Sequence, residues 1–445
     1  MTSDPPVPGS NLPSLDAPAG FFARDGAWRC DGVSLADIAR EVGTPSYVYS
    51  AALIRARYAR LAAALAGCRH GVHYALKANS SLALVTLIRG LGASADANSV
   101  GEIELALRAG FRPEQIVFTG VGKSRDELAR AVGLGLKAIN AESRGELERI
   151  DAESVRQGRR TRVALRVNPD VDAQSHPHIS TGMKRNKFGV PIGDARALLV
   201  EMAARPGLEV VGIHVHVGSQ ITTLEPLERA AEKMIQLAAK LLKSDGIALE
   251  HLDLGGGLGI SYTGGTEPDV EAYATVVTAA ARATGLSLIV EPGRWLVGNA
   301  GALLSEIIDM KPAPDDAAPD PHTVPGRPAR QFVILDAGMT DLMRPALYGA
   351  VHRIVRVEAA TGPDVPCDIV GPVCESSDAF LGDRTLVDPR VGALVAILDA
   401  GAYGAAMGSN YNRRPLAPEV LVEDGRWRVI RRKQTVDDMV RLECP

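Results

Sequence analysis

The chain has 445 residues, which is too many for one ordinary domain, so we expect two. Apolar residues make up 46% of the sequence and aromatic residues only 4%, so its cores must consist mainly of Ala, Val, Leu and Ile. With 49 basic and 53 acidic residues the formal net charge is −4, which indicates neither a nucleic-acid-binding nor a membrane-binding surface.

The cysteines and the N-terminal residues indicate the cellular compartment in which we expect the protein. The cysteines are too few and too scattered for a disulfide framework or a Cys-rich zinc site, so we expect a reducing, cytoplasmic environment. Residues 1–20 are rich in Pro and Ser and lack the basic and apolar segments of a signal peptide, so we expect a flexible tail. No apolar run approaches the length of a membrane span. The five cysteines are Cys30, Cys68, Cys367, Cys374 and Cys444.

Residues 21–35 (FFARDGAWRCDGVSL) contain two Asp-Gly pairs, which are typical of hairpin turns. We expect residues 21–44 to supply strands that join a β domain further along the chain rather than the segment that follows them.

From about residue 45, short β-branched runs alternate with longer Ala-, Leu- and Arg-rich stretches of helical period. Alternating strands and helices indicate a parallel sheet, and eight such units predict a closed (β/α)8 TIM barrel over residues 45–305, with an open doubly wound sheet as the alternative. The expected strands are 72–78, 93–97, 116–120, 137–142, 162–169, 210–218, 251–257 and 286–294. Expected helices include 52–66, 81–91, 100–109, 125–134, 143–157, 224–243 and 269–284.

The pattern changes after residue 305. A Pro-, Asp- and Ala-rich stretch at about 311–330 has the composition of an exposed insertion. Strand-like runs with few helix signals follow it, so we expect residues 306–445 to form a mainly-β domain. These runs are 331–338, 352–359, 367–374, 393–401 and 419–430.

Polar residues lie where the first two barrel strands should end, and those ends converge on one face of a barrel. Lys77 ends the first strand; it is either a lysine that reaches solvent from a sheet edge or a nucleophile. A buried ammonium is costly unless it is paired or neutralised, and a nucleophilic lysine must lose its proton. Asp96 lies at the end of the second strand and could instead cap the next helix, as could Asn98 or Ser99.

The later strands end in further candidates. His214 and His216 are two residues apart on one strand and could bind a metal, but we find no Cys or carboxylate at matching spacing, so a hydrogen-bonded core histidine is favoured and no metal is expected. Ser219 and the glycines at 255–257 and 259 suit an anion, because their backbone can approach it closely. Glu291 and Arg294 flank a Pro-Gly turn, either as a surface ion pair or as a carboxylate for a cationic ring nitrogen beside an anion site.

The mainly-β domain contains two further pairs of candidate functional residues. Cys374 and Glu375 are adjacent in a loop, and Arg344 and Tyr348 are one turn apart if helical; either pair could be structural or functional. An amine, a phosphate cradle, a carboxylate for a protonated ring and an imidazole that could stack on it together describe a site for pyridoxal 5′-phosphate.

At this point the sequence resembles a known family. YALKAN (74–79), HVGSQ (216–220), GGG (255–257), EPGR (291–294) and CES (374–376) are similar to the decarboxylases of the alanine-racemase fold, and most similar to the bacterial diaminopimelate decarboxylases. The resemblance runs from residue 44 to residue 425, and residues 176–190 resemble that family's active-site loop. The N-terminal tail and the 311–330 insertion depart from it.

The resemblance implies a role for each matching residue. Lys77 would form the Schiff base with pyridoxal 5′-phosphate, His216 would stack on its ring, Glu291 would pair with its nitrogen with Asp96 nearby, and Cys374 would protonate the substrate's Cα. The phosphate would be held by Ser219, Gly256, Gly257, the backbone at Gly293 and Arg294, and Tyr403.

The resemblance also implies the reaction: decarboxylation of meso-2,6-diaminopimelate to L-lysine, the last step of lysine biosynthesis. The substrate's second carboxylate calls for an arginine and its second ammonium for an anion. Arg294, Arg344, Tyr348 and Tyr403 are candidates for the carboxylate and Glu375 for the ammonium. The family implies a homodimer in which the neighbouring subunit supplies Cys374 and Glu375.

Several alternatives remain open. They are a decarboxylase of the same fold acting on ornithine, arginine or a carboxylated polyamine such as carboxynorspermidine, an amino-acid racemase, and a cofactor-binding protein without catalysis. Related ornithine enzymes carry Asp after the cysteine, so the Glu in CES favours diaminopimelate.

Overall fold

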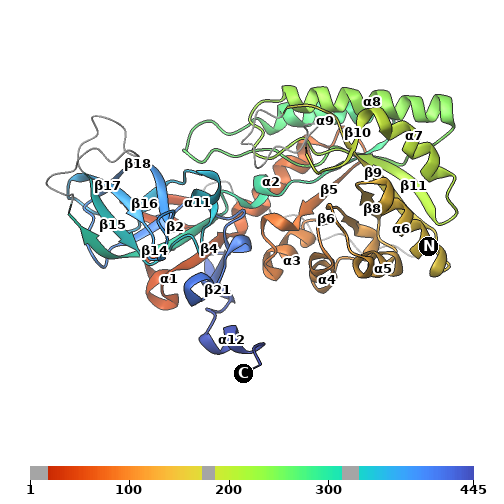
Figure 1. The fold of residues 1–445 in the computed structure, drawn as a ribbon. Coiled ribbons are helices and arrows are strands. Elements are labelled where there is room, and N and C mark those ends of the chain that lie inside the picture. The colour runs from red at the N-terminus through yellow and green to blue at the C-terminus, as the bar shows by residue number, and fades with distance from the viewer. Residues whose placement is uncertain (1–18, 173–185, 313–329, 445) are drawn as a thin grey trace, which may run out of the picture.

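A computed structural model describes residues 19–172, 186–312 and 330–444. The expected flexible tail, most of the 311–330 insertion and most of the expected active-site loop at 176–190 therefore lie outside the described residues. Figure 1 shows two parts, a barrel surrounded by helices and a β-rich part beside it.

The first part is a closed barrel of eight parallel strands, and the predicted (β/α)8 fold is confirmed. Each strand pairs in parallel with its neighbours, and the ring closes where β8 pairs with β9. In addition, the two-residue strand β10 (Val190–Pro191) pairs with β9. The barrel strands are β5 (His70–Ala75), β6 (Ser94–Ala97), β7 (Ile116–Phe118), β8 (Ala138–Ala141), β9 (Thr161–Asn168), β11 (Leu208–His214), β12 (His251–Asp253) and β13 (Ser287–Val290).

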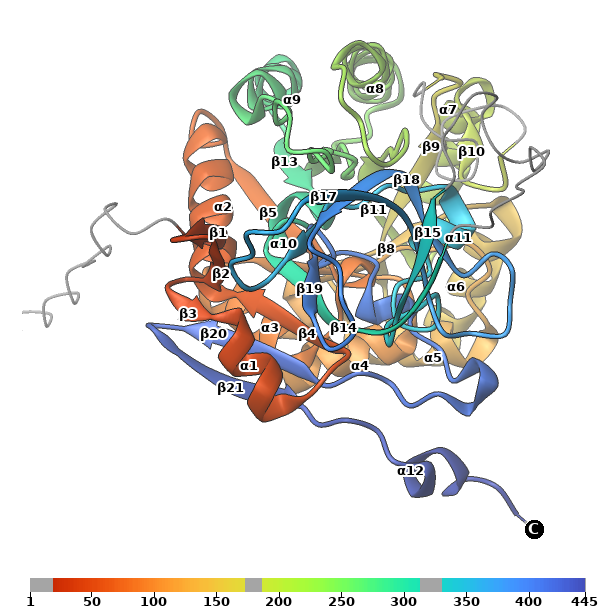
Figure 2. The same ribbon diagram turned by 90° about the vertical axis from the view of Figure 1, so that its left-hand side faces the viewer.

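Helices surround this barrel, as Figure 2 shows. Their starts follow from local sequence: Ser50, Ser99 and Ser143 each accept a hydrogen bond from the backbone of the first turn. Gly246 and Gly285 end the last two helices in the left-handed conformation. The helices are α2 (Ala51–Ala64), α3 (Leu82–Gly90), α4 (Val100–Arg108), α5 (Arg125–Leu134), α6 (Arg144–Arg156), α7 (Ile192–Ala203), α8 (Glu225–Asp245) and α9 (Val270–Thr284).

The second part is built on one sheet, in the order β18-β17-β15-β14-β4-β20-β21, with β19 paired to β14 and β16 to β19. The strands are β4 (Ser46–Ser50), β14 (Gly301–Lys311), β15 (Gln331–Leu335), β16 (Ile354–Arg356), β17 (Asp364–Val370), β18 (Ala379–Val387), β19 (Leu394–Ile397), β20 (Glu419–Glu423) and β21 (Arg426–Arg431). Short helices α10 (Arg294–Val297), α11 (Arg344–Tyr348) and α12 (Val436–Val440) follow β13, β15 and β21.

Two segments differ from the sequence-based boundaries. We expected residue 45 to open the barrel domain, but β4 pairs with β14 and β20 in the second sheet, so the barrel begins with α2. Residues 21–34 form a separate antiparallel sheet of β1 (Phe21–Arg24), β2 (Ala27–Cys30) and β3 (Val33–Ser34), followed by α1 (Leu35–Val42). This sheet lies against the β-rich part, since Trp28 N donates to Val357 O at 2.8 Å.

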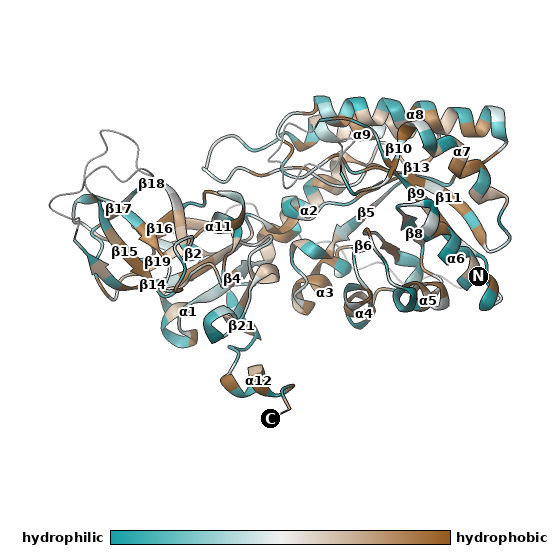
Figure 3. Cartoon of the chain, in the orientation of Figure 1, coloured by the Kyte–Doolittle hydropathy of each residue, from teal (hydrophilic) through white to brown (hydrophobic). Residues whose placement is uncertain are grey.

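Hydropathy follows this architecture. In Figure 3 the strands are mainly apolar, while the helices on the outside alternate between apolar and polar residues. One apolar core runs from the barrel into the second part, joining Leu76 and Val290 to Tyr47, Tyr49 and Leu421. The two parts are thus packed together around the ends of the barrel strands. Among the helices of the described residues, none has an apolar stretch long enough to cross a membrane.

Candidate active site

A cavity lies where the barrel strands end and the second part meets them. Eight of the residues predicted from sequence line it: Lys77, His216, Ser219, Gly257, Glu291, Gly293, Arg294 and Tyr403. The remaining lining residues are Ala75, Gln220 and Leu258.

Lys77 lies on a single 3-10 turn, Leu76–Ala78, just beyond β5, rather than on the strand itself. Its Nζ donates to Asn98 Oδ1 at 3.2 Å and lies 3.8 Å from Asp96 Oδ2. Burial by itself lowers the pKa of Lys77, but electrostatic interactions, first with Asp96 and then with Tyr403 and Glu291, outweigh it and hold the pKa above its ordinary value. The side chain of Lys77 is 35% exposed, and the lysine is paired rather than neutralised in the free protein.

Asp96 is fully buried at the end of β6 and does not line the cavity, but it lies beside Lys77; the cap of the next helix is Ser99. Both Asp96 oxygens accept from Asn98 Nδ2 at 3.3 Å. Burial, followed by the charge of Glu291, raises the pKa of Asp96 to about 6, while Lys77 opposes that rise. Asn98 thus bridges the lysine and the carboxylate, a role that sequence reasoning missed because it suggested only helix capping.

Glu291 lies at the end of β13, and its two oxygens differ. Oε2 accepts from His214 Nε2 at 3.3 Å, whereas Oε1 is buried and has no hydrogen-bond partner among the described residues. Burial acts to raise the pKa of Glu291, but His214 and Lys77 outweigh it, so that the pKa lies well below the usual range. Glu291 is thus an ionised, buried acceptor that still lacks a donor.

Asp253, at the end of β12, lies close to His214 and Glu291. Its Oδ1 accepts from Gly255 N at 2.9 Å, and burial together with Glu291 raises its pKa well above the ordinary value. We found no carboxylate near the histidines in the sequence, but the fold brings Asp253 and Glu291 to His214, with possible ligand atoms within 4.8 Å of one another. His214 and Gly255 each hydrogen-bond to one of these carboxylates, and we assign no metal to the cluster.

His216 lies just beyond β11, and its imidazole lines the cavity. Its Nδ1 accepts from Gly256 N at 3.1 Å, so this nitrogen carries no proton. Burial, reinforced by the charges of Lys77 and Arg166, lowers the pKa of His216 well below its ordinary value. The ring is therefore neutral and can lie flat against an aromatic group in the cavity.

The glycine segment Gly255–Gly257 has no room for side chains. A Cβ at Gly256 would lie 2.2 Å from Glu291 O, and a Cβ at Gly257 would lie 2.5 Å from Gly218 O. Gly257 also has a φ of +105°, which disfavours any other residue. The absence of side chains leaves the backbone free to approach a ligand closely.

Two buried arginines lie beside the cavity around one tyrosine. Arg294 is hydrogen-bonded to Tyr262 Oη and lies 4.8 Å from the ring centre of Tyr403. Arg344, on α11, lies 4.3 Å from the ring centre of Tyr262, and its Nη1 contacts His352 Nε2 at 2.7 Å. Neither arginine forms an ion pair with a carboxylate of the described residues, so both can take an anionic ligand. Sequence reasoning missed Tyr262 and His352, which belong to no motif that we used.

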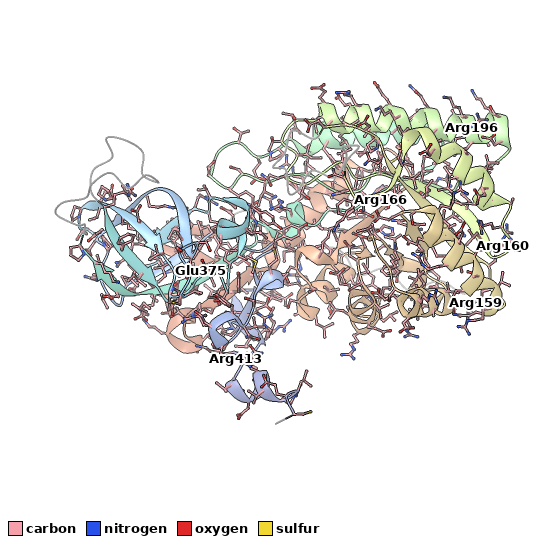
Figure 4. The ribbon with its side chains drawn as sticks, in the orientation of Figure 1. Arg159, Arg160, Arg166, Arg196, Glu375 and Arg413 are labelled. Carbon is pink, nitrogen blue, oxygen red and sulfur yellow. The ribbon has the colours of Figure 1, made fainter. Side chains whose placement is uncertain are left out.

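Cys374 and Glu375 are not brought to the cavity of their own chain. Both are exposed in the loop between β17 and β18, where Cys374 N donates to Asn412 Oδ1 at 3.0 Å. Figure 4 labels Glu375 in the β-rich part and Arg166, whose charge acts on Lys77, in the barrel. Tyr348 lies on α11 four residues after Arg344 and is half-buried.

Comparison with known proteins gives consistent matches. Residues 51–298 match the family model described as "Pyridoxal-dependent decarboxylase, pyridoxal binding domain". A protein named diaminopimelate decarboxylase from Pseudomonas aeruginosa is 43% identical, and the match covers 94% of this chain and 97% of that protein. A protein of the same name from Aquifex aeolicus is 41% identical, and the match covers 94% of this chain and 96% of that protein. The crystal structure of diaminopimelate decarboxylase from Helicobacter pylori complexed with L-lysine matches with a TM-score of 0.85 and 38% identity, over 92% of this chain and 98% of that one.

Proposed function

This chain belongs to the family of the diaminopimelate decarboxylases, and on that premise we propose that it converts meso-2,6-diaminopimelate into L-lysine and CO2, the last step of lysine biosynthesis. Its cofactor is pyridoxal 5′-phosphate. The observation that carries the proposal is the convergence on one cavity of Lys77, the ionised Glu291 and Arg294, which has no carboxylate partner among the described residues.

The cavity fits the three reactive parts of this cofactor. Lys77 offers an amine for the aldehyde, and Glu291 Oε1 offers a buried acceptor for a protonated ring nitrogen. Arg294 and the unhindered backbone of the glycine segment suit the phosphate, together with Ser219 and Tyr403. When bound, pyridoxal 5′-phosphate supplies the electron sink that a decarboxylation requires.

The chain's own residues prepare this chemistry. Lys77 must release a proton before its Nζ can attack a carbonyl, whereas the nearby carboxylate of Asp96, 3.8 Å away, favours the protonated amine. Asn98 holds both groups in place. His216 would lie against the cofactor ring as a neutral imidazole and would therefore add no positive charge beside Lys77.

Recognition of the non-reacting end of the substrate requires groups beyond the cofactor site. The guanidinium of Arg344, with help from Arg294, Tyr348 and Tyr403, suits the distal carboxylate, because a guanidinium binds a carboxylate through two parallel hydrogen bonds. Glu375 suits the distal ammonium.

We expect purified protein supplied with the cofactor to release CO2 and L-lysine from meso-diaminopimelate, in equal amounts. Coupled assays of both products, with and without added pyridoxal 5′-phosphate, measure this. L-Ornithine, L-arginine and carboxynorspermidine serve as comparison substrates, and chiral chromatography detects racemisation. Faster release of CO2 from one of these substrates than from diaminopimelate, or racemisation without CO2 release, would overturn the proposal.

The position of Cys374 and Glu375 leads to a proposal about assembly. Both are exposed and do not line the cavity of their own chain, which is what a site completed by a neighbouring subunit requires. The enzyme is thus a homodimer in which Cys374 of one subunit donates a proton to the substrate's Cα in the other, and Glu375 binds the distal ammonium there.

A shared site predicts complementation between two inactive variants. Lys77→Ala and Cys374→Ala should each be nearly inactive as homodimers, since each lacks one essential group in both sites. After mixing and subunit exchange, activity should return to roughly a quarter of the wild-type value, because half of the dimers are mixed and each has one complete site. Decarboxylase assays before and after exchange, with size-exclusion chromatography as the control for dimer formation, measure this. If no activity returns although mixed dimers form, each site is made by one chain.

A further inference from the structure

His352 is a buried histidine that no motif singled out, and it connects Arg344 to the protein backbone. It lies between α11 and β16, with 1% of its surface exposed. One ring nitrogen, Nδ1, is 3.0 Å from Leu398 O, and the other, Nε2, is 2.7 Å from Arg344 Nη1.

These two contacts determine where the proton lies. A carbonyl oxygen can only accept, so Nδ1 carries the proton and donates it to Leu398 O. A guanidinium can only donate, so Nε2 is the acceptor for Arg344. Burial, together with the charge of Arg344, lowers the pKa of His352 to about 3, which keeps the ring neutral at physiological pH.

The other contacts of Arg344 leave part of its guanidinium available. The Cζ of Arg344 lies over the Tyr262 ring. That ring meets the His352 ring edge-on, with 5.1 Å between the two ring centres. Arg344 Nε is buried and has no hydrogen-bond partner among the described residues. A carboxylate in place of His352 would neutralise Arg344 and compete with an anionic ligand. A neutral acceptor holds the guanidinium in place and leaves its charge uncompensated.

We propose that His352 is a positioning residue for substrate specificity: its Nε2 orients Arg344 so that the remaining N–H groups bind the carboxylate at the non-reacting end of the substrate. This inference rests on the proposed role of Arg344 in substrate recognition. The orientation matters because a carboxylate takes up both of its hydrogen bonds only from a guanidinium presented in its plane.

Two isosteric substitutions separate the two hydrogen bonds of His352. In His352→Asn the amide nitrogen occupies the place of Nδ1 and keeps the bond to Leu398 O, but nothing accepts from Arg344. In His352→Gln the amide oxygen reaches the place of Nε2 and still accepts from Arg344. His70→Asn, at a partly exposed histidine at the start of β5, is the matched control away from the cavity.

The test compares two ligands that differ only by a carboxylate, L-lysine and 1,5-diaminopentane, with dissociation constants measured by calorimetry on cofactor-loaded protein. We expect His352→Asn to weaken L-lysine binding about tenfold and to leave 1,5-diaminopentane binding within about twofold. His352→Gln should remain within about threefold of wild type for both ligands. In turnover, His352→Asn should raise KM for meso-diaminopimelate more than it lowers kcat.

An Arg344→Met variant distinguishes failure of the inference from failure of its premise. If Arg344→Met weakens L-lysine binding selectively but His352→Asn does not, the role of His352 is refuted and that of Arg344 stands. If Arg344→Met changes both ligands equally, the carboxylate is bound elsewhere and both assignments fall. In the double variant we expect His352→Asn to add nothing to Arg344→Met, whereas additive losses would contradict the positioning role.

Discussion

Replacing Lys77 with alanine should reduce turnover of meso-diaminopimelate by about 10⁴-fold or more, because no other amine of the described residues lines the cavity. The absorbance band at about 420 nm that the cofactor gives when linked to a lysine should be absent as well. Lys77→Arg should give the same result although it keeps a positive charge beside Asp96, since a guanidinium does not lose its proton at neutral pH.

The matched control is Lys123→Arg. Lys123 is a buried lysine near the ends of the barrel strands, but its Nζ donates to Gly120 O, Asn140 O and Glu146 Oε1 at 2.7–2.9 Å, and it does not line the cavity. This variant should lose stability in thermal unfolding and keep the absorbance band. Substantial turnover in Lys77→Ala, or loss of the band in the Lys123 variant alone, would refute the assignment of Lys77.

The second large effect is expected for Glu291→Gln, which keeps the shape of the side chain and removes its charge. The pKa of Glu291 lies well below its usual range, so the wild-type carboxylate is ionised at all physiological pH values and can favour a protonated ring nitrogen. Without that charge kcat should fall about 10²- to 10³-fold, as is typical when one electrostatic contact to the reacting group is lost. KM should change much less, because Glu291 does not touch the distal end of the substrate.

Steady-state kinetics and absorbance spectra of the loaded variant measure this prediction. Glu419→Gln is the control: Glu419 is a buried glutamate of the β-rich part, paired with Arg431 at 2.8 Å and remote from the cavity lining. It should lower the free energy of unfolding without changing kcat. A Glu291→Gln enzyme with wild-type kcat would show that another group pairs with the ring nitrogen.

Most of the fold could be predicted from local patterns. Alternating apolar runs and helical segments placed all eight barrel strands, and serine caps and C-terminal glycines set several helix ends within one or two residues. The place of β4 could not be predicted, because its partners β14 and β20 lie some 250 and 370 residues further along the chain, and pairing over such distances leaves no local signal.

The features of the candidate site likewise fall into those that the sequence predicts and those that only the folded structure shows. By itself the sequence determined which chemical groups stand at the strand ends: Lys77, His216, the glycine segment, Glu291 and Arg294. Only the tertiary structure decided that Lys77 is paired and charged, that Glu291 is ionised with one free oxygen, and that His352 holds Arg344. The physical reason is that strand and turn preferences act between neighbours in the chain, whereas charge states and hydrogen-bond partners depend on burial and on distances between residues that only the folded chain brings together.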